Sequence, residues 1–499
     1  MKKSLGKLIS SVYVIVYMAI SLVVVLAPCN IEIKRSHNIN IMNITCVLFV
    51  MLFIVIIYYM QSRLQISDKQ RKMFVIIGGA VLFGIQMVIL ISIGNNVGCD
   101  VHTIHEGAIN ALCPTEDYEY YWYYYLQNPN NIFITFILTV FLKVGDVINL
   151  EGYLLFTIAG MLLANISTFF TEKIVWKLTG NNTWAIISWL ISAILVACNP
   201  WIVAPYTDVF SLCIPIGTLY VCVVEEKIYK KIFWILFAGI GIGYLIKPTN
   251  IFVGVSFLIV EILIGKKEKL QSKNAILVGA EVILIIIFLV CLKGTVESKL
   301  GYAQDKDYEK SIWYYAMMGQ NDDTVGEYSY EDDQATNEHK KYEDKVKFNQ
   351  KKLVERIRDR GIKGNIGFYI KKTLNDFGDG MFAWGNWPII NDLTDKPTTW
   401  VRQVIEEYKQ GNLVQCVWIF CILGSPLMLL QDSSDDKCRL IVQLSLILLF
   451  IYLMVFEASA RYIYHYVPIY IVVAADGYHR VIVRYGENVG KKKYITKKR

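Results

Sequence analysis

The sequence predicts an all-α polytopic membrane protein with about twelve transmembrane helices. Two observations predict this class. The composition is 55% hydrophobic and 19% charged, with a mean hydropathy of +0.40, a balance typical of chains that reside in a membrane. In addition, apolar blocks of about 15 to 22 residues recur from end to end, and each is close to the length that crosses a hydrocarbon core.

The predicted spans follow one another along the whole chain. The first comes after a basic segment at residues 1–7, and no small-residue cleavage site precedes Pro28. We therefore interpret it as a retained helix and not as a secretory signal. The spans are predicted at residues 10–27, 45–60, 74–94, 152–173, 184–198, 209–224, 232–246, 250–264, 275–293, 413–430, 440–456 and 466–483.

The apolar segment Ile132–Val144 is treated differently, because its length of about 13 residues is typical of interfacial helices. Lys and Arg in short loops favour the cytoplasmic side. If the segment does not cross the membrane, most Lys and Arg residues of the short loops lie on the same side as the basic tail, Lys491–Arg499. If it does cross, most Lys and Arg residues of the later loops lie outside. We therefore predict that Ile132–Val144 lies in the outer interface of a plasma membrane, with both termini cytoplasmic.

Charge and cysteine usage give no sign of nucleic-acid binding or of a C-x-x-C site. The net charge of +7 does not indicate nucleic-acid binding, because the bases lie in short loops and the tail, where they face anionic membrane lipids. Most of the eleven cysteines lie inside apolar segments without a C-x-x-C pair, which is typical of small buried hydrophobic residues. Cys99 and Cys113 lie in a predicted outer loop, where a disulfide between them is one alternative.

Four regions are expected. Residues 1–73 hold two N-terminal spans, residues 74–293 a membrane core with an outer loop at 95–150, residues 294–411 a mixed extracytoplasmic insertion, and residues 412–499 the last spans and the basic tail. Within the insertion, the apolar spacing of Gln334–Arg360 predicts a helix. The chain has no Walker loop and no Gly-rich dinucleotide fingerprint, so nothing indicates direct use of a nucleotide.

The outer loop carries the strongest catalytic candidate. Residues 95–131 hold five acids and no Lys or Arg, and Asp100 follows the preceding span by a few residues. We predict that Asp100 is the catalytic residue, with Glu106 and Asp117 as weaker alternatives, although a solvated loop acid or a helix cap would read the same way. Asp208 lies in a second outer turn, where it would orient an acceptor, assist a metal or cap the next helix.

Basic residues at the same face are candidates for binding phosphate. Lys247 precedes Pro248 in a short turn between spans, and Arg461 and His465 follow the penultimate span. A charge at this depth is costly unless it has a function or a partner. The alternative is snorkelling to the interface, together with a Glu457–Arg461 pair on one helical face.

A metal site is a further alternative, but it is not expected. His102, His105 and Glu106 are close in sequence to Asp100. They would supply three ligands without a distant fourth, so a divalent metal is possible and no cofactor is predicted with certainty.

Four stretches of the chain resemble the integral-membrane glycosyltransferases of the GT-C superfamily, and most closely family 39, which holds protein O-mannosyltransferases and the aminoarabinose transferase. These stretches are Asp100 soon after a span, Asn128–Asn131 opening the interfacial helix, Asn199–Asp208 (NPWIVAPYTD) and Gly243–Pro248 (GYLIKP). The resemblance covers about residues 74–475 and is topological. Two extra spans precede the acidic loop, and Pro-Asn-Asn replaces a His-Pro-Pro turn, so the sugar and acceptor are not specified.

The resemblance implies transfer of a sugar from a polyprenyl-phosphate donor to a cell-envelope glycan, lipid or protein at the outer face, with inversion. A phosphate leaves without being protonated, so one general base and one cationic clamp are sufficient, whereas glycoside hydrolysis needs a second carboxyl. Asp100 is the expected base, and Lys247, Arg461 and His465 are the expected phosphate ligands. The alternatives are a flippase for a lipid-linked sugar and a polymerase or ligase of related architecture that takes a pyrophosphate-linked donor.

Overall fold

The computed structural model describes residues 2–26, 39–95, 98–113, 118–263, 272–301, 305–384, 412–428 and 437–496, and this part of the chain is helical with no β-strand. The first seven helices are α1 (Lys2–Leu26), α2 (Ile39–Arg63), α3 (Asp68–Ile93), α4 (Asp100–Leu112), α5 (Tyr118–Gln127), α6 (Ile132–Ile148) and α7 (Gly152–Thr179). The middle of the chain forms α8 (Asn182–Ser192), α9 (Thr207–Ser211), α10 (Cys213–Val224), α11 (Ile228–Trp234), α12 (Gly243–Ile246), α13 (Phe252–Leu263) and α14 (Ser272–Leu300). The remaining helices are α15 (Ile312–Met318), α16 (Tyr330–Asn337), α17 (Tyr342–Phe377), α19 (Asn412–Gly424), α20 (Lys437–Val455) and α21 (Val467–Thr496).

Local signals in the sequence set where these helices begin and end. Ser67 and Gln70 form a capping box at the start of α3, and Gly94 stops the same helix with a φ of 78°. Gly180 ends α7 in the left-handed region, and the Asn181 side chain accepts two backbone N–H bonds that start α8. The hairpins between long apolar helices are therefore encoded by a few cap residues.

Eight helices in the described part of the chain are long and apolar enough to cross a membrane, and four shorter apolar helices accompany them. The long ones are at Ser4–Leu26, Asp68–Ile93, Pro129–Ile148, Gly152–Thr179, Thr207–Val224, Ile228–Ile246, Gly279–Leu300 and Lys437–Val455. The shorter ones are Thr45–Gln61, Asn182–Ala197, Pro248–Leu263 and Leu413–Leu427. The predicted all-helical membrane protein is confirmed, but the predicted number of about twelve spans is not. Pro129–Ile148, which was predicted to be interfacial, is among the long segments, and the predicted span 466–483 is not among the segments of either kind.

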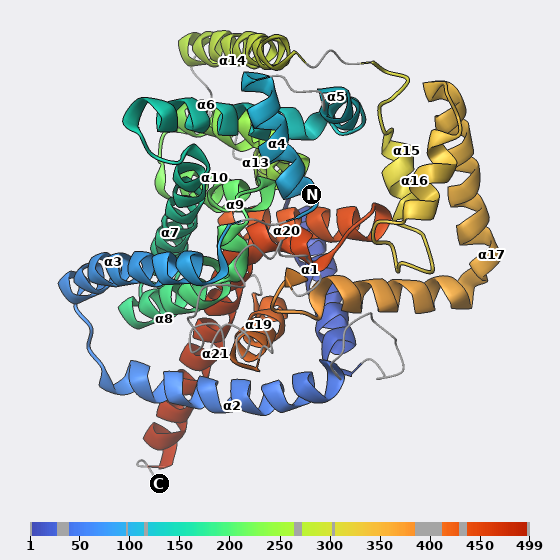
Figure 1. The fold of residues 1–499 in the computed structure, drawn as a ribbon. Helices are drawn as coiled ribbons and strands as arrows, with labels where there is room; N and C mark the ends of the chain where they lie inside the picture. Colours follow the sequence, from blue (N-terminus) through green and yellow to red (C-terminus); the bar gives the residue numbers. More distant parts are fainter. Residues whose placement is uncertain are drawn as a thin grey trace.

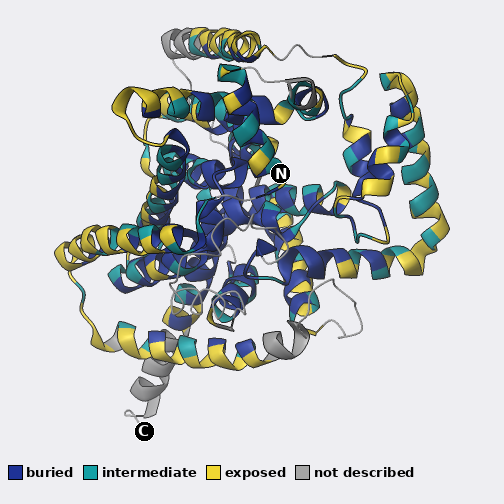
Figure 2. Ribbon diagram, in the orientation of Figure 1, coloured by how far each residue is buried: buried dark blue, intermediate teal, exposed yellow. Residues whose placement is uncertain are grey.

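Buried residues gather where the helices converge, and exposed residues lie mostly on the peripheral helices (Figure 2, in the orientation of Figure 1). The first half of α21 runs through this centre against α7, α8 and α19, and almost every residue from Val467 to Tyr478 is buried. In contrast α2, α3 and α14 carry rows of exposed Leu, Ile and Val, which suit contact with lipid. The core therefore surrounds α21, and the peripheral helices present apolar surface.

Helix α6 has both of its ends on one face of the protein. Its start, Asn131, accepts a bond from Tyr206, and its end turns at Asn149 directly into α7. Tyr153, in the first turn of α7, stacks on His105 of α4 with ring centroids 3.9 Å apart and donates to the Asn95 carbonyl. The expected length of about 13 residues was too short, because the helix has 17 residues, and together with the turn Pro129–Asn131 it is long and apolar enough to cross a membrane. Its interfacial position remains a prediction.

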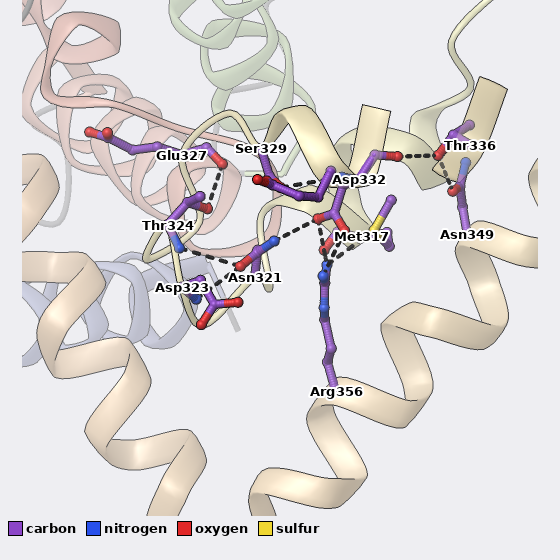
Figure 3. A network of polar contacts seen from close by, with 11 residues as sticks. Met317, Asn321, Asp323, Thr324, Glu327, Ser329, Asp332, Thr336, Asn349 and Arg356 are labelled. Carbon is purple, nitrogen blue, oxygen red and sulfur yellow. Dashed lines mark hydrogen bonds and ion pairs between the residues drawn. The ribbon is translucent and has the colours of Figure 1, made fainter. Parts of the chain in front are cut away.

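The polar insertion is helical where it is described. Helices α15, α16 and α17 lie together beside the main bundle (Figure 1). The predicted helix Gln334–Arg360 is confirmed in part, because α16 ends at Asn337 and α17 begins at Tyr342. Arg356 of α17 donates two hydrogen bonds to Asp332 at 2.7 and 2.9 Å and a third to the Met317 carbonyl, and Asn321 donates to the same Asp332 (Figure 3). The described part is not mixed in structure, and residues 385–411 of the insertion lie outside the described residues.

A separate group of buried ion pairs lies at the opposite helix ends. Arg439 of α20 binds Asp476 of α21 through two bonds of 2.8 Å, and Arg480 adds a third to the same carboxylate at 3.0 Å. Arg71 of α3 likewise binds Glu172 of α7, both almost fully buried. Because each carboxylate is buried among cations, these pairs fix the register between helices.

We expect Asp476→Ala to lower the free energy of unfolding by about 3 to 5 kcal/mol, because two guanidinium groups would lose their buried counter-charge. The matched control is Asp344→Ala, which removes an exposed pair with Lys347 at 3.8 Å and should cost less than about 1 kcal/mol. Chemical denaturation in detergent micelles measures both. Equal losses for the two variants would contradict the assigned role.

Candidate functional site

Asp100 is the first residue of α4, and its carboxylate contacts the hydroxyl groups of two tyrosines. The preceding Cys99 has a φ of 58°, which turns the chain sharply before the helix begins. Tyr124 of α5 donates to Asp100 Oδ1 at 3.0 Å, and the Tyr206 hydroxyl lies 3.4 Å from Oδ2. The carboxylate is half-buried and held by two phenol groups from different segments.

Asn131 links these two tyrosines. Its Nδ2 donates to the Tyr124 hydroxyl at 2.6 Å, and its Oδ1 accepts from the Tyr206 hydroxyl at 3.0 Å. The Tyr206 proton points to one acceptor at a time, and the shorter distance favours Asn131 over Asp100. These four side chains form a ring of contacts in which hydrogen bonds run from Tyr206 through Asn131 and Tyr124 to Asp100, while the Tyr206 hydroxyl lies near the other oxygen of the same carboxylate.

A charged cluster adjoins this ring. Asp208, one residue past Thr207, forms a close ion pair with Lys247, and its other oxygen lies 3.6 Å from Arg461 Nε. All three side chains are at most 11% exposed. The Arg461 guanidinium lies 5.6 Å from the centre of the Tyr206 ring, so one tyrosine contacts both Asp100 and the cluster. One carboxylate faces two cations here, which favours binding of an anion.

Burial and charge set the protonation of the surrounding groups. Burial lowers the pKa of Lys247, and Asp208 offsets part of that shift. Burial also lowers the pKa of His465 well below its usual range, and the neighbouring Lys247 lowers it further, so this imidazole is neutral at physiological pH. Burial raises the pKa of Glu457.

The proposed Glu457–Arg461 pair on one helical face is absent. The segment is not an α-helix: it is a 3-10 helix over Ala460–Tyr466, so residues four apart do not share a face. Glu457 accepts from the Tyr462 hydroxyl at 2.9 Å, and Arg461 turns to Asp208. The Tyr462 ring also lies under the Lys247 ammonium, 4.7 Å from its centroid.

The polar insertion, residues 294–411, makes direct hydrogen bonds to the segment Phe456–Ala458, which precedes Arg461. Lys372 of α17 donates to the carbonyls of Gly319 and Phe456 at 2.6 and 2.7 Å. The Glu457 and Ala458 amides donate to the Tyr315 and Gly326 carbonyls. A side chain at Gly319 would collide with the Phe456 backbone at 2.3 Å, so only glycine permits this approach. The polar insertion is therefore bound to the segment that leads to Arg461.

A cavity of about 350 Å³ opens next to the cluster. It is lined by Asn130 beside Asn131, by Leu245 and Pro248 on either side of Lys247, and by Tyr315 of the insertion. Apolar residues of α6 and α14 form much of the remaining wall, and two lysines and two glutamates also line it: Lys293, Glu297, Glu309 and Lys310. The cavity thus combines an apolar wall with a polar lining of both charge signs, which suits an amphiphile.

The structure separates the predicted site residues into two groups. Asp100, Asp208, Lys247 and Arg461 are brought together from four segments. His465 lies beneath Lys247, where its Nε2 is 3.0 Å from Thr249 Oγ1, so it supports the turn that holds the lysine. Glu106 contacts His105 at 3.6 Å instead of Asp100, and Asp117 lies outside the described residues.

The structure also bears on the alternatives of a Cys99–Cys113 disulfide and of a metal site. Cys99 and Cys113 are free thiols at opposite ends of α4. Fourteen helical steps separate them by roughly 20 Å, far beyond the reach of a disulfide. No group of three His, Cys, Asp or Glu residues suited to a metal occurs in the described part of the chain.

Sequence reasoning missed Tyr124 and Tyr206 as partners of Asp100. Tyr124 was assigned with its neighbours to an interfacial aromatic belt, and Tyr206 was only part of a quoted motif. The sequence signal that could have pointed to these residues was the recurrence of polar turns at the predicted outer ends of the transmembrane helices. Asn131 was within such a turn, Asn128–Asn131, but its hydrogen bonds depend on the tertiary structure.

The sequence model of a protein family described as "Conserved hypothetical integral membrane protein" matches residues 1–480. The comparisons with curated proteins and with solved structures return no match.

The fully buried Asp376 of α17 gives the protein a specific pH dependence of stability. Burial raises the pKa of Asp376 to about 8, so between about pH 4 and 8 the folded chain holds a proton that the unfolded chain releases. The free energy of unfolding should therefore fall as pH rises through this window. We expect Asp376→Asn to remove this slope, a difference of up to about 3 kcal/mol between pH 5 and 7.5, measured by denaturation at each pH.

Lys372 does not cancel that slope, because burial lowers its pKa to about 8 and its own contribution appears at higher pH. The control Asp323→Asn changes an exposed carboxylate and should keep the wild-type slope. A wild-type protein whose stability rises steadily from pH 5 to 7.5 would contradict the assignment.

Proposed function

Because this chain belongs to the conserved hypothetical integral membrane protein family, we propose a function carried out at a membrane surface. The protein transfers a sugar from a polyprenyl-phosphate donor to a cell-envelope acceptor on the extracytoplasmic face of the plasma membrane. The observation that carries this proposal is the convergence of one half-buried carboxylate, Asp100, with a buried cationic pair, Lys247 and Arg461, around a single tyrosine, Tyr206.

In this proposal Asp100 removes the proton from an acceptor hydroxyl. The hydroxyl oxygen forms a bond to the anomeric carbon of the sugar while the bond from that carbon to the phosphate oxygen breaks, and attack from the opposite side inverts the configuration. The leaving phosphate carries the electron pair away and needs no proton. A positioned general base is typically worth about 10² to 10⁴-fold in rate.

Lys247 and Arg461 are proposed to bind the phosphate. Asp208 holds both cations in the apo protein, and an incoming phosphate would share them. Arg461 offers two parallel donors to phosphate oxygens, whereas Lys247 acts as a point charge. The cavity of about 350 Å³ beside Lys247 has an apolar wall for the first isoprene units of the carrier.

Topology gives independent support. The contacts of Asp100, Asn131 and Tyr206 require the segments before α6 and after α8 to share one face. Three apolar helices, α6, α7 and α8, separate those segments, so an odd number of crossings would break the contacts. An interfacial α6 satisfies this condition, and the positive-inside rule then puts the site outside and the basic tail inside.

The test is transfer by the purified protein in liposomes that contain a polyprenyl-phosphate sugar and an envelope extract as acceptor. Asp100→Asn should reduce transfer by at least about 100-fold with binding of donor retained. Lys247→Met should weaken donor binding instead.

The matched control is Glu106→Gln, which changes an acid on the same helix that contacts His105 and should leave transfer unchanged. Full transfer by a folded Asp100→Asn protein would refute the mechanism. Movement of donor lipid between leaflets without product would favour the flippase alternative.

A further inference from the structure

A groove lies on the membrane-facing side of α3 and α7, far from the site described above. It encloses about 450 Å³, and its walls include Lys72 and Gly79 of α3, Phe169 and Lys173 of α7, and Trp189 of α8. Lys72 lies in the second turn of α3, while the opposite end of that helix leads to Asn95 and Asp100. The separation along the helix is roughly 30 Å, so the groove opens in the other leaflet.

The groove has one cationic end and one apolar end. Lys72 and Lys173 lie at the end of the helices, with side chains 57% and 22% exposed. Seven residues further along α3, about 10 Å deeper, is Gly79, where an added Cβ would meet no atom within 4 Å. Phe169 and Trp189 provide most of the remaining apolar wall, and Asn165 and Thr168 of α7 are polar residues in the same lining.

The charge of this end is positive even though its groups are paired. Arg71 is buried against Glu172 and Asp68, Lys72 lies 2.7 Å from Asp68, and Lys173 lies 3.6 Å from Glu172. Three cations therefore share two carboxylates. An anion bound between the two lysine ammonium groups would balance the remaining charge.

We propose that this groove binds an anionic glycerophospholipid of the leaflet opposite to the Asp100 site. Its phosphate lies between Lys72 and Lys173, and one acyl chain runs over Gly79 towards Trp189. A free phosphate would leave the apolar half of the groove unfilled, and a neutral lipid would leave the cations without a counter-charge. Both charge complementarity and shape therefore select a lipid with an anionic head group.

The experiment measures lipid retained by the full-length protein. Protein is reconstituted in nanodiscs with equal amounts of phosphatidylglycerol and phosphatidylcholine, released into mild detergent, and examined by native mass spectrometry. The wild type should retain phosphatidylglycerol preferentially. Gly79→Leu, which fills the groove, should lower the retained phosphatidylglycerol by about fivefold or more.

Gly84→Leu is the matched control. Gly84 lies on the same helix, also with no atom within 4 Å of an added Cβ, but about 140° further around it and outside the groove lining. It should retain lipid as the wild type does. The double variant Lys72→Ala and Lys173→Ala should lose the preference for phosphatidylglycerol over phosphatidylcholine while keeping its melting temperature in detergent.

Two outcomes would overturn the proposal: equal retention of the two lipids by the wild type, or undiminished phosphatidylglycerol in Gly79→Leu. A reduction shared equally by Gly84→Leu would also overturn it, because the effect would then belong to the surface of α3 and not to the groove.

Discussion

One carboxylate, Asp208, is buried between two cations, Lys247 and Arg461, and the arrangement of the surrounding segments depends on this contact. Each partner comes from a different turn between apolar helices, so the ion pairs fasten three hairpins at one end of the bundle. Breaking such a buried cluster leaves uncompensated charge at a cost of several kcal/mol. Because the cluster has two cations and one carboxylate, it carries an excess positive charge that an anionic ligand would balance.

The rest of the face is built onto that cluster. Tyr206 connects it to Asp100 through a shared ring and hydroxyl, and Lys372 fastens the insertion to the segment that carries Arg461. The ion pairs at the opposite helix ends, such as Arg439 with Asp476, act on stability and not on this face. The candidate site around Asp100 and Asp208 is thus separate from the ion pairs, such as Arg439 with Asp476, that join the opposite ends of the helices.

Sequence patterns predicted the all-helical membrane class, the positions of the apolar helices and four residues that converge, because hydropathy and isolated charges near span ends are strong signals. They did not predict the tyrosine and asparagine ring around Asp100, since such hydrogen bonds join residues far apart in sequence. The length of α6 was underestimated because the apolar run was taken to end at Val144. The helix continues past the exposed Asp146 to its cap at Asn149.

We predict that α6 begins and ends on the face that carries Asp100. Single cysteines placed at Glu151, Lys347 and Lys177, with the native exposed cysteines replaced by serine, can be labelled in intact cells by a reagent that does not cross membranes. We expect Glu151→Cys and Lys347→Cys to react from outside and Lys177→Cys to react only after permeabilisation. The reverse pattern, with Glu151→Cys reacting only after permeabilisation and Lys177→Cys reacting from outside, would show that α6 crosses the membrane and would contradict this placement.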